Sequence, residues 1–215
     1  MDDFNVQKQY WNGVADSKEF TTPFNNKLFD KYIPKTAKIL DIGCGYGRTL
    51  SALYENGYKN LLGLDISDEM ITAGKKRFPF LDLRVKPNEN IDLPDESVDA
   101  VLLFAVLTCI ADNETQNNLL SEIYRVLRKN GILCINDFLL NNDERNLQRY
   151  NKAAELQKFP YGVFEASEGV FLRHHDKEYI TELTKSFKSV YFYQDVYNTM
   201  NGHKSNGFMY FGQKV

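Results

Sequence analysis

The sequence is poor in the residues that build disulfide frameworks and metal sites. Its 215 residues include three cysteines and three histidines. The cysteines, at positions 44, 109 and 134, are odd in number and far apart, so we expect neither a disulfide framework nor a cysteine metal site. No His, Cys and acid spacing is typical of a metal-ligand set. We therefore expect a reducing compartment and no bound metal.

Long apolar and basic runs are also lacking. The longest apolar run, Ala100 to Ala111, falls far below the ~20 residues of a membrane-spanning helix. Residues 1–5 are acidic and lack the apolar core of a secretory signal. The net charge of -3, with no basic run longer than residues 75–77, gives no electrostatic footprint for nucleic acid or an anionic membrane. We expect a cytoplasmic protein, monomeric or homodimeric, whose partners are small molecules.

A glycine-rich stretch follows the first apolar strand pattern. Gly43, Gly45 and Gly47 permit the positive φ values of a tight turn into a helix and leave room for a ligand at the backbone. A dinucleotide loop needs its third glycine one position later, where this chain has Arg48. That difference disfavours an NAD-type oxidoreductase. Asp41, just before the loop, would repel a pyrophosphate and suits a cationic ligand.

From residue 38 onward, strand and helix patterns alternate. This alternation predicts an α/β fold with a mostly parallel sheet and helices on both faces. Asp65 ends the second strand about 20 residues after the glycine loop, where an acid accepts hydrogen bonds from ribose hydroxyls. The expected strands are 38–42, 61–65, 82–86, 97–104, 132–136, 190–197 and 207–211.

Two strings in this alternating region carry a family resemblance. ILDIGCGYGR, residues 39–48, resembles the first motif of the class I S-adenosylmethionine-dependent methyltransferases, and YRVLRKNGILCINDF, residues 124–138, resembles their third motif. The resemblance extends over about residues 35 to 140. It implies a seven-stranded, mostly parallel sheet whose last strand is reversed, within a single domain spanning residues 1–215.

The resemblance also implies a reaction. We expect S-adenosylmethionine as cofactor and in-line displacement of its methyl group by an O, N or S atom of a small molecule. Two alternatives stay open: a regulatory protein that binds the cofactor without turnover, and a non-methylating enzyme, such as a cyclase, that uses the same sulfonium.

The expected cofactor residues come from the strand ends and the N-terminal segment. Ile66 and Met70 are placed to sandwich an adenine, although Met70 also suits plain helix packing. Asn88 stands where the family usually has an acid that reads the adenine amino group, and Glu89 is the alternative reader. The full set is Tyr10, Trp11, Asp41, Gly43, Gly45, Gly47, Asp65, Ile66, Met70, Asn88, Glu89, Asn90, Phe104 and Leu107.

Residues 1–34 are expected to form a helical lid. Thr22 before Pro23 is typical of a helix N-cap followed by a first-turn proline. One hypothesis is that Tyr10, Trp11 or Phe20 closes over the cofactor and faces the sulfonium through cation–π attraction. The alternative is that these aromatic rings dock the N-terminal helix onto the sheet.

Residues 141–175 interrupt the alternation and are expected to build the acceptor pocket above the strand ends. His174 or His175 is a candidate general base, although an ordinary surface histidine is the alternative. Adjacent residues of an extended segment point to opposite faces, so at most one of the two is expected to act. Tyr161 and Arg149 complete the catalytic candidates. Arg145, Arg149 and Arg173 either bind an acceptor anion or lie on a solvated helix face, and the cysteines at 44 and 109 are expected to be packing residues.

Overall fold

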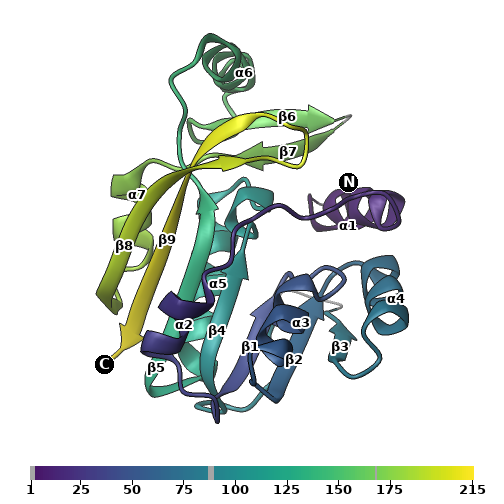
Figure 1. Cartoon of the computed structure of the whole chain (residues 1–215). Helices are drawn as coiled ribbons and strands as arrows, with labels where there is room; N and C mark the ends of the chain where they lie inside the picture. The colour runs from purple at the N-terminus through teal and green to yellow at the C-terminus, as the bar shows by residue number, and fades with distance from the viewer. Residues whose placement is uncertain (1–2, 87–89, 168) are drawn as a thin grey trace.

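The computed structural model describes residues 3–86, 90–167 and 169–215. Its centre is a seven-stranded sheet in the order β3-β2-β1-β4-β5-β9-β8 (Figure 1). β9 runs antiparallel to both of its neighbours, and the other pairs of this sheet are parallel. The fold class and the reversed last strand expected from the sequence are therefore confirmed. The strands are β1 Lys38–Ile42, β2 Asn60–Asp65, β3 Asp82–Val85, β4 Val98–Phe104, β5 Leu127–Phe138, β8 Phe187–Asn198 and β9 Lys204–Lys214.

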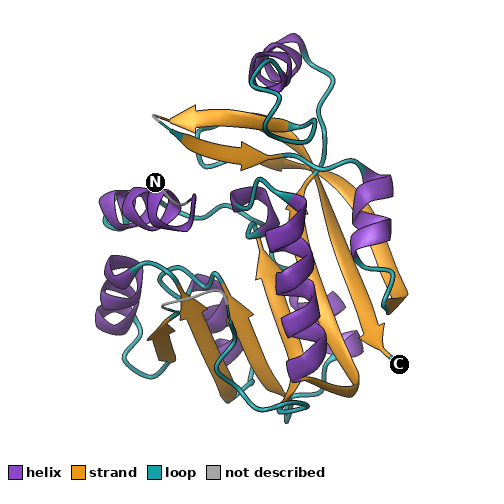
Figure 2. Cartoon of the chain, turned by 180° about the vertical axis from the view of Figure 1, so that it is seen from behind, coloured by secondary structure: helices purple, strands orange, loops and turns teal. Residues whose placement is uncertain are grey.

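Helices cover both faces of this sheet. Along β4, Val101 and Leu103 pack into the cluster with the helices of one face, while Ala100 and Leu102 pack with those of the other. Side chains alternate between faces along a strand, and here both sets are buried, which is why the β4 sequence is apolar throughout. One face carries α2 Asn26–Tyr32, α3 Arg48–Glu55 and α4 Asp68–Arg77, and the other, in front in Figure 2, carries α5 Asn113–Val126 and α7 Lys177–Leu183.

The strand order reverses at β1, which pairs with β2 on one side and β4 on the other. In open parallel sheets, ligands bind outside the carboxyl ends of the strands at such a reversal. The loops after β1, β2 and β4 all leave the sheet at that edge (Figure 1). The topology therefore places a binding site directly over the glycine loop.

Two segments lie over this edge. The first is α1 Asp3–Val14, which is next to α4 and β7 (Figure 1), followed by an extended stretch. The helix expected to start after Thr22 begins instead at Asn26, where the Asn25 side chain accepts from the Leu28 N–H at 3.0 Å. The N-cap prediction was wrong because the carbonyls of Thr22 and Pro23 accept tertiary hydrogen bonds that hold this stretch extended.

The second segment is the insertion after β5. It contains α6 Glu144–Ala154 and a hairpin of β6 Val163–Ser167 and β7 Val170–Arg173, both above the sheet in Figure 1. A parallel bridge between Leu139 and His175 returns the chain to the end of β5. The insertion is thus closed at its base and stands over the strand ends.

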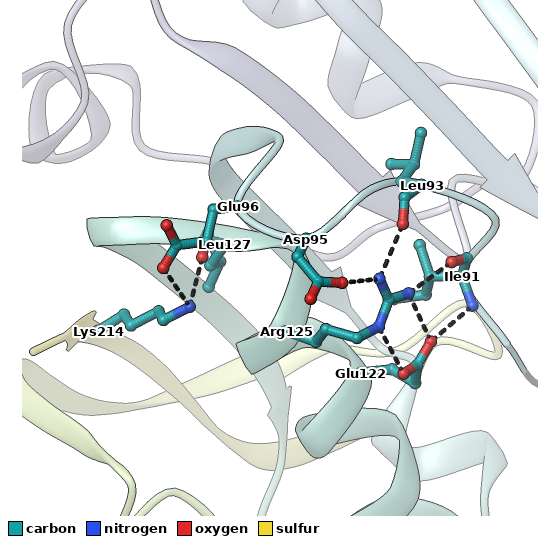
Figure 3. Close-up of polar contacts among 8 residues, drawn as sticks. All are labelled: Ile91, Leu93, Asp95, Glu96, Glu122, Arg125, Leu127 and Lys214. Atoms are coloured by element: carbon teal, nitrogen blue, oxygen red, sulfur yellow. Dashed lines mark hydrogen bonds and ion pairs between the residues drawn. The ribbon is translucent and has the colours of Figure 1, made fainter.

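A clasp made by Arg125, Glu122 and Asp95 holds the loop before β4 against α5 (Figure 3). Arg125 donates to the carbonyls of Ile91 and Leu93 at 2.8 and 2.9 Å and pairs with Glu122 and Asp95. The hydrogen bonds from Arg125 lower the pKa of Glu122 to about 2, so this carboxyl stays ionised. Glu122 also lines the cavity described below, and the clasp therefore fixes one rim of the site.

Candidate active site

A cavity of about 740 Å³ lies over the carboxyl ends of the strands. It has two ends, which differ in the elements that line them. The strand end is lined by Asp41, Gly43, Gly45, Asp65, Ile66, Met70, Asn90 and Phe104. The α6 end is lined by residues of α6, of the hairpin and of the β8–β9 turn, among them Arg145, Asn146, Arg149, Phe164, Leu172 and His174.

The glycine loop at the strand end has the backbone expected from the sequence. Gly43, Gly45 and Gly47 have φ values of 68°, 54° and 87°, a region that other residues enter at a cost. A Cβ on Gly45 would lie 2.3 Å from a ring carbon of Phe20, and one on Gly43 would lie 2.5 Å from Val106. Side chains therefore cover this loop so closely that only glycine fits beneath them.

Asp65 ties the glycine loop to the start of α4. Its two carboxylate oxygens accept the N–H groups of Gly45 and Ser67 at 2.7 and 2.9 Å. Burial raises the pKa of Asp65, and these backbone hydrogen bonds oppose that shift. Ser67 in turn caps α4, because its hydroxyl accepts from the Met70 N–H.

Asp41 is a buried acid at the end of β1. Burial and the nearby Asp65 charge raise the pKa of Asp41 to about 8, while the neighbouring Arg48 acts in the opposite direction. Arg48 donates to the Thr22 carbonyl at 2.7 Å and so joins the extended stretch after α1 to this loop. At neutral pH Asp41 is mostly protonated, and a cation placed beside it would favour its ionised form.

Aromatic residues of the N-terminal segment form one wall of the cavity. Trp11 and Phe20 line it, and Phe20 stacks on Tyr46 with ring centroids 5.0 Å apart. Tyr10 is not among the lining residues and meets Trp11 edge-on at 5.1 Å. Of the three rings named from the sequence, two thus reach the cavity and one supports them.

The remaining expected cofactor residues divide into three groups. Ile66, Met70, Asn90 and Phe104 line the cavity. Gly47 and Leu107 do not, and Leu107 is fully buried in the short helix η1 Leu107–Cys109. Asn88 and Glu89, which were expected to hydrogen-bond the adenine amino group, lie outside the described residues.

His174 lines the α6 end of the cavity, and its Nδ1 is hydrogen-bonded to residues that do not line the cavity. Its Nδ1 lies 2.5 Å from the Tyr150 hydroxyl and 3.2 Å from the Asn141 amide nitrogen. The Asn141 amide cannot be turned over, because its oxygen accepts from the Asn206 N–H and its nitrogen donates to the Leu139 carbonyl. With the Tyr150 hydroxyl as the donor to Nδ1, Nε2 carries the hydrogen of the neutral ring.

The expectation of a surface histidine is wrong for both neighbours. His174 and His175 are 7 % and 0 % exposed, and burial lowers the pKa of each to about 3. His175 does not line the cavity, because its Nε2 lies 2.9 Å from the Gln116 amide and its Nδ1 3.3 Å from the Phe138 carbonyl. The Leu139–His175 bridge explains the difference, since adjacent residues of that segment point to opposite sides.

The insertion's other candidates also separate. The guanidinium carbon of Arg149 lies 3.6 Å from the Phe164 ring centroid, and Arg149 lines the cavity, so its helix face is not simply solvated. Arg173 is buried away from the cavity and donates to Asn113. Tyr161 is 50 % exposed, is not a lining residue, and packs edge-on against Tyr150.

The cysteines near the loop have the character of packing residues. Burial raises the pKa of Cys44 and of Cys109, so both stay protonated thiols at neutral pH. Among residues 3–86, 90–167 and 169–215, no group of three or more His, Cys or acidic side chains is placed to hold a metal ion. No helix within these ranges is long and apolar enough to cross a membrane.

Sequence reasoning missed the residues that hold others in place. Arg48 was noted for the glycine it replaces, but not for its bond to Thr22. Tyr150 and Asn141, which fix the His174 ring, were not singled out. These partners lie 24 and 33 positions from His174, so no local motif reveals them.

Comparison with known proteins identifies the family. A family model described as a methyltransferase domain matches residues 40–135. An uncharacterized methyltransferase of Schizosaccharomyces pombe is 30% identical over 177 residues, which cover 80% of this chain and 67% of that protein. A crystal structure of a SAM-dependent methyltransferase from Methanosarcina mazei superposes with a TM-score of 0.82 at 24% identity, covering 87% of this chain and 97% of that one.

Two further relatives are named for different acceptors. A ubiquinone/menaquinone biosynthesis C-methyltransferase of Campylobacter jejuni is 29% identical over 118 residues, which are 52% of this chain and 49% of that protein. A human eEF1A lysine and N-terminal methyltransferase is 32% identical over 119 residues, which are 50% of this chain and 17% of that protein. This chain spans two thirds of the first relative's length and half or less of these two.

The sheet order, the glycine loop and these matches together define the class. The chain belongs to the class I S-adenosylmethionine-dependent methyltransferases.

Proposed function

We propose that this methyltransferase acts on a small-molecule acceptor, by in-line displacement of the cofactor's methyl group. The observation that carries the proposal is the single cavity with two chemically different ends. The strand end offers buried acids, and the α6 end offers arginines and an N–H of His174. Two ligands bound in one enclosed space would meet over the strand ends, which gives the reaction proximity and excludes water.

The strand end fits S-adenosylmethionine on its own chemistry. Asp65, at the end of β2, would accept hydrogen bonds from the ribose hydroxyls, and Asp41 would face a positive group. Ile66 and Met70 both line the cavity beside them and would contact the adenine. When bound, the cofactor supplies an electrophilic methyl group on a sulfonium leaving group. The chain's own contribution is to orient the two reactants.

His174 is assigned to acceptor binding rather than to proton abstraction. Its Nδ1 is occupied by Tyr150 and Asn141, so the ring presents an N–H to the cavity and not a lone pair. In-line transfer to an acceptor that is already nucleophilic needs no base. The general-base hypothesis for this histidine is therefore set aside in favour of a positioning role.

The raised pKa of Asp41 makes cofactor binding proton-linked. Below pH 8 the free protein holds a proton on Asp41, and a bound ammonium favours the carboxylate, so binding releases that proton. Affinity for S-adenosylhomocysteine should rise with pH to a maximum near 8 and fall above it, because the ligand's α-amino group then loses its charge. Calorimetry at pH 6.5, where an α-amino group of pKa ~7.8 is already charged, should give heats that differ between phosphate and imidazole buffers. Asp41→Asn should remove this difference, and buffer-independent heats in the unmodified protein would reject the assignment.

The proposed function can be tested by following the methyl group of radiolabelled S-adenosylmethionine. Protein incubated with methyl-tritiated S-adenosylmethionine and a whole cell extract should produce a labelled small molecule other than the cofactor, and no labelled protein. Asp65→Ala should abolish that labelling. Label found only in protein would contradict a small-molecule acceptor and indicate a protein acceptor. Binding of S-adenosylhomocysteine without transfer to an acceptor would favour the regulatory alternative. Label recovered in methylthioadenosine, the thioether left when another S–C bond of the sulfonium is broken, without a methylated acceptor would favour a cyclase.

A further inference from the structure

The α6 end of the cavity carries arginine side chains that form no ion pair within the described residues. Arg145 and Arg149 lie one helical turn apart on α6, and both line the cavity. In the described part of the chain, neither forms an ion pair with an acidic side chain. Asp143 lies near them, but its carboxylate accepts the Asn146 amide at 2.6 Å. The charge of these arginines is therefore left for a ligand.

Arg149 is also held in a defined orientation. Its guanidinium lies 3.6 Å from the Phe164 ring centroid, and one nitrogen donates to the Asn146 oxygen at 3.1 Å. That contact uses one of the five N–H groups of the guanidinium. Burial and the charge of Arg145 both lower the pKa of Arg149, so keeping it charged here costs free energy. A planar, oriented and half-buried guanidinium is well suited to bind a carboxylate or phosphate through two parallel hydrogen bonds.

The other polar groups at the α6 end also favour an anionic ligand. His174 presents its Nε2–H, since its Nδ1 is occupied from behind. Lys204 adds a further positive charge, and among the described residues of α6, the hairpin and the β8–β9 turn, Glu165 is the acid in the lining. Glu165 is exposed and already accepts the Gly169 N–H at 2.9 Å. The strand end, in contrast, carries the buried carboxyl groups of Asp41 and Asp65 beside Arg48.

We propose that the methyl acceptor carries an anionic group, a carboxylate or a phosphate, which Arg149 binds together with Arg145 and the Nε2–H of His174. This inference rests on the proposed methyl transfer and names the class of its substrate. The anion would sit under α6, and the atom to be methylated would extend from it towards the strand end.

The experiment uses simple probes on the protein saturated with S-adenosylhomocysteine. Benzoate, phenyl phosphate and the neutral benzamide are titrated by calorimetry at constant ionic strength. Benzoate or phenyl phosphate should bind at least tenfold more tightly than benzamide, and whichever binds more tightly identifies the anion. Equal binding of all three probes, or no binding of either anion, would overturn the inference.

Variants locate the effect on α6. Arg149→Met should lower affinity for the favoured anion at least tenfold, Arg149→Lys should lower it less, and neither should change S-adenosylhomocysteine affinity by more than threefold. Lys152→Met, on the same helix but outside the cavity lining, is the matched control and should leave both affinities unchanged. An Arg149→Met protein that binds the anion as the unmodified protein does would refute the site. Failure of S-adenosylhomocysteine to bind the unmodified protein would instead refute the proposed function.

Discussion

Gly45→Val is expected to abolish binding of S-adenosylhomocysteine while leaving the protein folded. The new Cβ would lie 2.3 Å from Cε2 of Phe20, so the side chain must displace that ring into the space of the cavity. The φ of 54° adds backbone strain of about 1 to 3 kcal/mol. Calorimetry measures the loss of binding, and thermal unfolding shows whether the fold persists.

Gly57→Val is the control that separates the effect of backbone strain from the effect of a side chain that occupies ligand space. Gly57 also has a positive φ, but its added Cβ would meet only a side-chain atom of Lys35 at 3.9 Å, and it is not a lining residue. We expect this variant to lose stability and keep S-adenosylhomocysteine affinity. If Gly45→Val binds the ligand as the unmodified protein does, the glycine loop is not the cofactor site.

Asp65→Ala is expected to weaken S-adenosylhomocysteine binding by about 2 kcal/mol or more, which is roughly thirtyfold. Two charge-assisted hydrogen bonds to the ribose hydroxyls would be lost. The N–H groups of Gly45 and Ser67 would also lose their acceptor, so the loop itself would be less well fixed. Isothermal titration at pH 8 gives the affinity.

Asp68→Ala is the control for that measurement. Asp68 is an acid three positions later, is largely exposed and pairs with Lys8. Its removal should change ligand affinity by less than threefold, since exposed ion pairs contribute little. If Asp65→Ala binds S-adenosylhomocysteine as tightly as the unmodified protein, Asp65 does not bind the ribose hydroxyls.

The strands and the glycine loop were predictable because their signals are local. The apolar pattern of β4 reflects burial on both faces, and the positions of Gly43, Gly45 and Gly47 reflect a backbone that the turn itself requires. Such features depend on neighbours within a few residues, so a single sequence contains them.

The α6 end of the cavity was predictable only in outline. The sequence located the insertion, but which histidine faces the cavity is decided by the bridge between Leu139 and His175. The failed N-cap at Thr22 has the same origin, because its carbonyl is engaged by Arg48, 26 residues away. Contacts between distant residues carry no periodic or spacing signal, and the acceptor residues depend on such contacts.

The way the N-terminal segment is fastened has a kinetic consequence. Gln7 donates to the Phe171 carbonyl, Lys8 pairs with Asp68, and Thr21 donates to the Asn198 carbonyl. The Lys8 and Thr21 contacts are exposed and contribute about 1 kcal/mol or less each, and the part-buried Gln7 hydrogen bond contributes about 1 kcal/mol. Releasing the segment is therefore far cheaper than unfolding the sheet, so we expect cofactor and product to exchange by local opening at this end. Turnover would then be limited by how often the segment detaches, and lengthening residues 15–19 should speed product release without touching the residues that hold either ligand.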